Sequence, residues 1–119
     1  MNSVLLVDDD DFLRESLGEL LRQEGYQVVA VHDGATAIQV GKGKDSWFAI
    51  ITDFSMGEVN GAEVIRHFSS SPIHFEKKIL LTGHASDTPQ IANLLRDLNV
   101  SYVAKPFNLG DLLKVMIEP

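Results

Sequence analysis

Short apolar runs alternate with segments of helical periodicity from one end of this chain to the other. Five runs have the length of a buried strand, near Ser3–Val7, Tyr26–Val31, Trp47–Thr52, Lys77–Leu81 and Val100–Ala104. In the segments between them, apolar residues recur every three or four positions, as they do on a helix that covers a sheet. Because strands that are largely apolar are covered on both faces, the alternation predicts a parallel sheet between two layers of helices.

Capping and turn signals between the runs support five successive βα units. Gly25 ends the first predicted helix, Asp33 is placed to cap the second, Thr88-Pro89 opens the fourth, and Asn108–Ile117 forms the last. Right-handed crossovers leave few arrangements for such units. We therefore expect an α/β fold of the doubly wound, flavodoxin-like (βα)5 kind, a three-layer sandwich whose parallel sheet has the order 2-1-3-4-5.

Length and composition limit the organisation and the partners of the chain. Its 119 residues fit one domain, residues 1–119, with any effector domain absent or outside the chain. A formal net charge of −7 argues against direct binding to nucleic acid. There is no cysteine, signal-peptide core or apolar stretch of membrane-spanning length, so we expect a cytoplasmic protein without membrane contact. Trp47 and the six phenylalanines are expected to pack in the core.

Four of the five runs end in residues with reactive or charged side chains. The first run leads into Asp8-Asp9, the third into Asp53, the fourth into Thr82 and the fifth into Lys105. The carboxyl ends of parallel strands lie at one edge of the sheet, where open α/β sheets place their ligand sites. Three carboxylates, a hydroxyl and an ammonium at a shared edge are the parts of a Mg2+-dependent phosphoryl-transfer site.

Each of these residues also has a purely structural explanation when it is taken singly. Asp8 to Asp11 could cap a helix, Asp53 could occupy a turn, Thr82 could fill a β-strand and Lys105 could be an exposed cation. Clustered carboxylates repel one another by roughly 4 kcal/mol per pair at 4 Å and an effective dielectric constant of 20, so a compensating cation is expected. Lys105 precedes Pro106, and a cis bond between them would turn the ammonium toward the acidic edge.

The pattern as a whole resembles the receiver domain of two-component response regulators. The matching segments are Asp8-Asp9 after the first strand, Asp53–Met56 with Gly61 after the third, Thr82-Gly83 after the fourth, and Tyr102–Phe107 at the fifth. Each segment alone is a weak signal, but the correctly spaced set covers essentially the entire chain. The resemblance implies that Asp53 accepts a phosphoryl group and that Thr82 and Lys105 contact it.

The resemblance also implies a metal site, a switch and a set of partners. Asp9 would bind Mg2+ directly, Asp8 would act largely through water, and Asp53 and the backbone carbonyl of Ser55 would complete the site. Tyr102 would swing inward when Thr82 moves. The phosphoryl donor would be a sensor histidine kinase or phosphotransfer protein, and the output a downstream effector domain or protein. The chain would then catalyse only its own phosphorylation and dephosphorylation.

The sequence departs from the usual receiver pattern at a few positions. Gly57 stands where a proline is usual, so the loop after Asp53 is expected to be more mobile. Ser55 and His84 occupy the two positions that tune the dephosphorylation rate in this family. Ser101 replaces the acid that often precedes the switch aromatic in receivers that dimerise, which puts such dimerisation in doubt.

Two other functions fit parts of the sequence. A receiver-like interaction module would bind partners without phosphorylation, but its signature is the loss of pocket residues, and none of them is missing from this sequence. A haloacid-dehalogenase-like phosphatase also uses an aspartyl phosphate, and Asp8-x-Asp10 after the first strand, together with Thr82 and a lysine, resembles that family. Such phosphatases need further acidic residues late in the chain and are usually larger.

Overall fold

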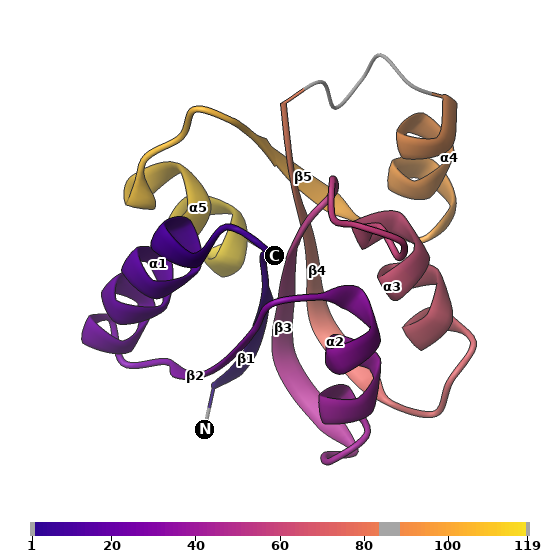
Figure 1. Ribbon diagram of the computed structural model, residues 1–119, viewed down its shortest axis with the longest axis horizontal. Coiled ribbons are helices and arrows are strands. Elements are labelled where there is room, and N and C mark those ends of the chain that lie inside the picture. Colours follow the sequence, from indigo (N-terminus) through magenta and orange to yellow (C-terminus); the bar gives the residue numbers. More distant parts are fainter. Residues whose placement is uncertain (1, 84–88, 119) are drawn as a thin grey trace.

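A five-stranded parallel sheet forms the centre of the molecule (Figure 1). The computed structural model describes residues 2–83 and 89–118. The strands lie in the order β2-β1-β3-β4-β5, as predicted from the sequence. They are β1 (Ser3–Val7), β2 (Gln27–Val31), β3 (Ser46–Asp53), β4 (His74–Thr82) and β5 (Ser101–Ala104).

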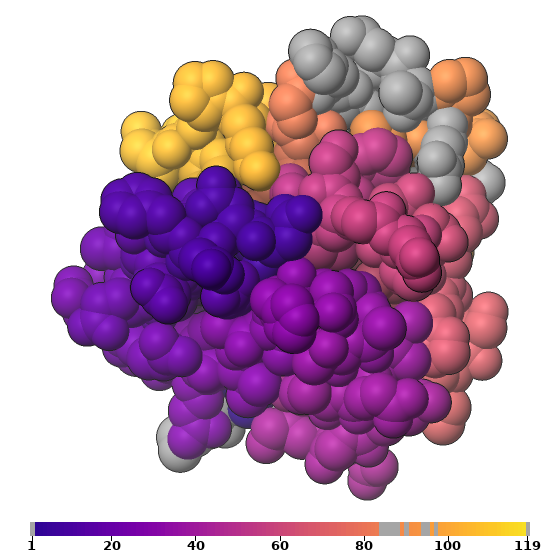
Figure 2. Space-filling view, viewed as in Figure 1, coloured from indigo at the N-terminus to yellow at the C-terminus, as the bar shows by residue number. Residues whose placement is uncertain are grey.

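Helices cover both faces of the sheet and complete the predicted three-layer sandwich. In Figure 1, α1 (Asp11–Gln23) and α5 (Leu109–Ile117) lie on one face. The other face carries α2 (Gly34–Gly41), α3 (Gly61–Ser69) and α4 (Pro89–Asp97). Each face has its own apolar core: Leu17 and Leu112 pack with Val4 on the first, and Phe68 packs with Leu5 on the second. The space-filling view shows α2 in purple directly beside the magenta segment that follows β3 (Figure 2).

Polar side chains cap the helices on the side of the sheet where the strands end. Asp10 accepts a hydrogen bond from the backbone N–H of Leu13, and Asp33 accepts one from Thr36. Asn60 and Asn108 each form a reciprocal capping box with the acidic residue three positions later. These caps satisfy N–H groups that lack an intrahelical partner. The expected start of the fourth helix at Thr88 lies outside the described residues, whereas Pro89 is the first residue of α4.

Strand β4 begins earlier than the sequence pattern indicates. It starts at His74 rather than Lys77, with His74 paired to Ser46 of β3. Phe75 is buried and stacks on Trp47 at a centroid distance of 6.1 Å, while His74 and Glu76 are exposed. The first part of this strand is therefore covered on one face only. Because this part of β4 contains charged residues, it does not form a continuous apolar run in the sequence, and its start was not predicted.

Phe12 does not lie in the core, contrary to the sequence-based prediction. Its exposed fraction is 81%, whereas Trp47, Phe68 and Phe75 are buried and the other phenylalanines pack partly buried against the core. The buried face of α1 is formed by Leu17, Gly18 and Leu21. At 3.6 residues per turn, Phe12 lies roughly 140° around the helix from Leu17, outside that face.

None of the described helices is long and apolar enough to cross a membrane.

Candidate functional site

The strand ends that carry the predicted site residues meet at one edge of the sheet. Asp8 follows β1 and donates its backbone N–H to the carbonyl of Val31, at 3.1 Å. Asp53 is the last residue of β3, and Thr82 is the last residue of β4. The backbone N–H of Lys105, just beyond β5, donates to the carbonyl of Thr82 at 2.8 Å. Parallel pairing thus delivers all four segments to the same place.

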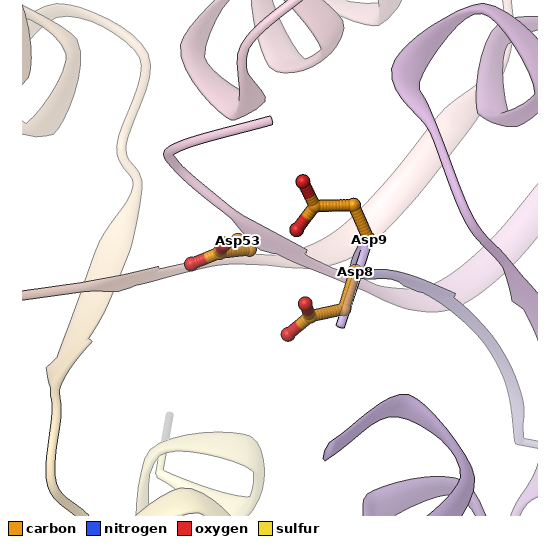
Figure 3. Close-up of side chains that lie close together, drawn as sticks. All are labelled: Asp8, Asp9 and Asp53. Carbon is orange, nitrogen blue, oxygen red and sulfur yellow. The ribbon is translucent and has the colours of Figure 1, made fainter. Parts of the chain in front are cut away.

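Three carboxylates lie around one common space at this edge (Figure 3). One oxygen of each of Asp8, Asp9 and Asp53 lies within 4.8 Å of the other two. Asp8 and Asp53 are buried, whereas Asp9 is exposed. A buried pair of carboxylates with a third at the surface provides hard oxygen ligands for one divalent cation that keeps part of its water.

Asp8 is held with one carboxylate oxygen free. Its Oδ1 accepts a hydrogen bond from the backbone N–H of Asp10 at 2.9 Å. Its Oδ2 is buried and has no hydrogen-bond partner among the described residues. Burial raises the pKa of Asp8 above its ordinary value, and the neighbouring charge of Asp53 raises it further. A buried acceptor without a partner is costly, and a bound cation or one of the waters that it keeps would satisfy it, so these residues fit the Mg2+ ion that the sequence implies.

Lys105 neutralises part of this acidic edge. Its Nζ lies 2.8 Å from Oδ1 of Asp53, whose side chain is 9% exposed. Partial burial lowers the pKa of Lys105, but the hydrogen bond to Asp53 and the charges of the nearby aspartates outweigh it, so the pKa lies above its ordinary value. The Lys105-Pro106 bond is cis, as the sequence suggested. The ammonium is therefore charged and directed at Asp53.

Thr82 and Tyr102 lie on the neighbouring strands β4 and β5. Thr82 is buried, whereas Tyr102 is 44% exposed and pairs with Leu80 across the β4–β5 ladder. The threonine proposed to sense phosphate is therefore inside, whereas Tyr102 is about half exposed. Ser101 is exposed beside it. His84 lies outside the described residues.

The loop after Asp53 contains Ser55 and Gly57, and it leads to Gly61 at the start of α3. Ser55 is exposed in this loop. Gly57 has a φ of +27°, a value that proline, with its ring fixing φ near −65°, does not adopt. The backbone at this position therefore suits the glycine that replaces the usual proline.

Two residues near the site, Gly61 and Arg14, have roles that were not predicted from the sequence. A Cβ atom on Gly61 would lie 2.3 Å from the carbonyl oxygen of Asp53, so only glycine fits there. The sequence feature that could have indicated a role for Gly61 is a glycine at the first position of a helix, directly after a favourable N-cap residue. Arg14 was detectable only as a lone cation in an acidic first turn.

A groove of about 380 Å3 opens beside the carboxylates. Its walls include Asp9, the start of α2 at Asp33 to Ala35, and Met56 to Val59 of the loop after β3. The groove leaves Asp9 accessible to solvent. An incoming cation can therefore reach the exposed carboxylate first.

The raised pKa of Asp8 predicts how the stability of the metal-free protein depends on pH. Asp8 binds its proton more tightly in the folded chain than in the unfolded chain, so its contribution to stability is fully present below the ordinary aspartate pKa and is lost as the pH rises through the raised value. We expect Asp8→Asn to raise the free energy of unfolding at pH 7 by up to about 3 kcal/mol, roughly the repulsion of two like charges about 5 Å apart at a dielectric constant of 20. Urea unfolding without metal at several pH values would measure the gain.

Two observations would check this prediction. The gain should shrink as the pH falls toward the ordinary aspartate pKa, because the raised pKa lets a growing fraction of Asp8 in the folded protein take up a proton. Asp9→Asn should give a smaller gain, because Asp9 is exposed and screened by water. A less stable Asp8→Asn protein at pH 7 would contradict the expected direction.

Comparisons with known proteins agree on one family. The family model described as the response regulator receiver domain matches residues 4–117. The chain is 34% identical over 113 residues to the transcriptional regulatory protein CpxR of Escherichia coli (strain K12), covering 95% of this chain and 47% of CpxR. It is 35% identical over 117 residues to the response regulator MprA of Mycobacterium ulcerans (strain Agy99), covering 95% of this chain and 47% of MprA.

Solved structures show the same architecture. The chemotaxis protein CheY4 of Vibrio cholerae superposes with a TM-score of 0.81 at 28% identity, over 96% of this chain and 94% of CheY4. The response regulator protein TrrA of Thermotoga maritima, solved in complex with Mg(2+)-BeF, superposes with a TM-score of 0.78 at 29% identity, over 96% of this chain and 95% of TrrA.

Proposed function

This chain belongs to the response regulator receiver domain family, and we propose that Asp53 is the residue on which it accepts a phosphoryl group. Receiver domains are signalling domains, the phosphoacceptors of two-component systems. One observation carries the assignment: the buried Asp53 carboxylate lies 2.8 Å from the Lys105 ammonium and within 4.8 Å of two further carboxylates. Asp8 and Asp9 in that cluster are suited to hold a cation rather than phosphate.

The proposed reaction is a transfer of one phosphoryl group to an oxygen of Asp53. That oxygen attacks phosphorus and forms the new P–O bond, while the bond from phosphorus to the donor breaks and its electron pair leaves with the donor. Lys105 donates hydrogen bonds to the phosphoryl oxygens, and the Thr82 hydroxyl is suited to do the same. Once bound, Mg2+ would neutralise the negative charge shared by the carboxylates and the phosphoryl group.

The cation would be held by the acidic cluster and one loop carbonyl. Asp9 would bind it directly, Asp8 largely through water, and Asp53 together with the carbonyl of Ser55 would complete the set. The buried Oδ2 of Asp8, which lacks a protein partner among the described residues, supports this assignment. Dephosphorylation rates would depend on Ser55 and His84, which occupy the tuning positions of the family.

Output requires the phosphorylated and free forms to differ in conformation. We assign this switch to Thr82 and Tyr102. Movement of the buried Thr82 toward phosphate would vacate space beneath β5, into which the half-exposed Tyr102 ring can turn. The burial of Thr82 and the exposure of Tyr102 support this assignment.

The partners proposed for this domain follow from its family. The phosphoryl donor would be a sensor histidine kinase or phosphotransfer protein, and the recipient of the signal a downstream effector domain or protein. The chain spans about half the length of the curated relatives that it matches. Residues 1–119 are proposed as a single receiver domain, with any effector domain absent or outside the chain. The net charge of −7 supports a role without direct nucleic-acid contact. A cytoplasmic location would give it access to kinases that use ATP.

A small phosphodonor tests this function directly. Incubation with acetyl phosphate and Mg2+ should add the mass of one phosphoryl group to most of the protein, and an excess of EDTA should prevent nearly all of the addition. Intact-mass spectrometry measures the product, and hydroxylamine should remove it because an acyl phosphate is labile to that nucleophile. Absence of any added mass would favour the interaction module, and continuous hydrolysis of a phosphomonoester would favour the phosphatase.

A further inference from the structure

Arg14 links the first turn of α1 to the end of β1 through its side chain. Its Nη1 donates a hydrogen bond to the backbone carbonyl of Asp8 at 2.9 Å. Its Nη2 donates to Oδ1 of Asp11 at 2.7 Å. The Arg14 side chain is only 15% exposed, although Asp11 is 81% exposed. The guanidinium therefore spans the whole turn from the strand to the helix.

The turn that Arg14 spans is the one that carries the proposed cation ligands. The backbone N–H of Asp8 is bonded to β2, and Oδ1 of Asp8 accepts from the N–H of Asp10. Asp10 in turn caps the helix through the N–H of Leu13. The hydrogen bond from Arg14 fixes the backbone carbonyl of Asp8 as well. Asp9, the exposed ligand, follows directly after that carbonyl, so the direction of its backbone depends on it.

General electrostatics disfavour a cation at this position. Arg14 lies in the fourth position of α1, near the positive end of the helix dipole. It also lies beside a site proposed to take a divalent cation, which its charge would repel. An arginine here is best explained by its hydrogen bonds, since a planar guanidinium can hold two acceptors at fixed separation.

We infer that Arg14 is a positioning residue for the cation site, and that it acts by fixing the Asp8–Asp11 turn rather than by its charge. The inference rests on the proposed Mg2+ site. In metal sites generally, groups that orient the ligands without touching the metal change affinity by about 10–100-fold when they are removed. Arg14 is expected to belong to this class.

The test compares Mg2+ affinity in matched variants of the whole chain. Arg14→Gln removes the guanidinium, and Arg14→Lys keeps the charge but supplies a single ammonium in place of the two-pronged donor. Arg22→Gln is the control, because Arg22 lies on the same helix and also donates to a backbone carbonyl, that of Val28, at 3.2 Å. Affinity is measured by amide chemical shifts during a MgCl2 titration. Trp47 lies at the opposite end of β3, roughly 20 Å from Asp53 at 3.3 Å per residue, and is a poor reporter.

A positioning role for Arg14 and a purely electrostatic role predict opposite changes in Mg2+ affinity. Arg14→Gln should weaken Mg2+ binding by about 10-fold, although the loss of a positive charge alone would tighten it. Arg14→Lys should recover only part of the loss, and Arg22→Gln should stay close to the unsubstituted protein. Unchanged or tighter binding in Arg14→Gln, or full recovery in Arg14→Lys, would overturn the inference.

The remaining outcomes separate this inference from the proposed function. If the unsubstituted protein fails to bind Mg2+, the proposed cation site itself is wrong. If Arg14→Gln does not fold, Arg14→Lys decides alone: it should bind Mg2+ more weakly than the unsubstituted protein, with amide shifts altered mainly at residues 8–14. An Arg14→Lys protein with unaltered affinity would then count against Arg14.

Discussion

Asp53→Asn is expected to abolish phosphoryl incorporation from acetyl phosphate while leaving the fold intact. An amide of the same shape fills the same space, but it is not an anionic nucleophile. It can still accept the hydrogen bond from Lys105, whose Nζ lies 2.8 Å from Oδ1 of Asp53. Intact-mass spectra after incubation with donor and Mg2+ should therefore show only the unmodified mass.

The control for this variant is an aspartate of the same strand region outside the site. Asp45 is exposed and lies just before β3, at the end of the sheet opposite the carboxylates. Asp45→Asn changes the charge by the same amount and should be phosphorylated like the unsubstituted protein. Persistence of the phosphoryl mass in Asp53→Asn would show that another residue is the acceptor, and peptide mapping would then identify it.

Gly61→Ala is expected to destabilise the fold by about 2–3 kcal/mol, near the upper end for overpacking of a tight site. The added Cβ would lie 2.3 Å from the carbonyl oxygen of Asp53 and 2.9 Å from Cδ1 of Leu80. The first contact is with backbone, so it cannot be relieved by a change of rotamer. Urea unfolding at equal m-value measures the loss.

Gly18→Ala is the matched control for this prediction. Gly18 is also a buried helical glycine, but its Cβ would meet Arg22 at 3.4 Å and Leu6 at 3.8 Å, which are ordinary contacts. Alanine should therefore be neutral or stabilise α1 by up to about 1 kcal/mol. Because the clash in Gly61→Ala displaces Asp53, that variant should also be phosphorylated more slowly. Equal stability of Gly61→Ala and the unsubstituted protein would refute the close approach.

The layers and the strand order were predictable because they depend on local periodicity and on chirality. Apolar strands covered on both faces, helical spacing between them and right-handed crossovers together leave few topologies. The sequence-based predictions were wrong where other elements cover only one face of a strand or helix. The start of β4 at His74 and the exposed Phe12 are both cases in which periodicity alone does not say which face meets a neighbour.

The composition of the site could also be read from the chain, because parallel strands bring their carboxyl ends to one edge. Asp8, Asp9, Asp53 and Lys105 are brought together by that rule alone. Their different environments were not predictable. Asp8 is buried whereas its neighbour Asp9 is exposed, and Oδ2 of Asp8 has no hydrogen-bond partner among the described residues.

Residue types and their order thus specified a parallel sheet with an acidic, phosphate-handling edge, because both follow from one-dimensional patterns. The folded arrangement was needed to find the 2.3 Å approach that reserves position 61 for glycine and the guanidinium of Arg14 that holds the carbonyl of Asp8. Contacts of this kind join a side chain to a backbone atom of another segment. Such atoms are common to every residue, so no pattern of side chains along the chain can predict them.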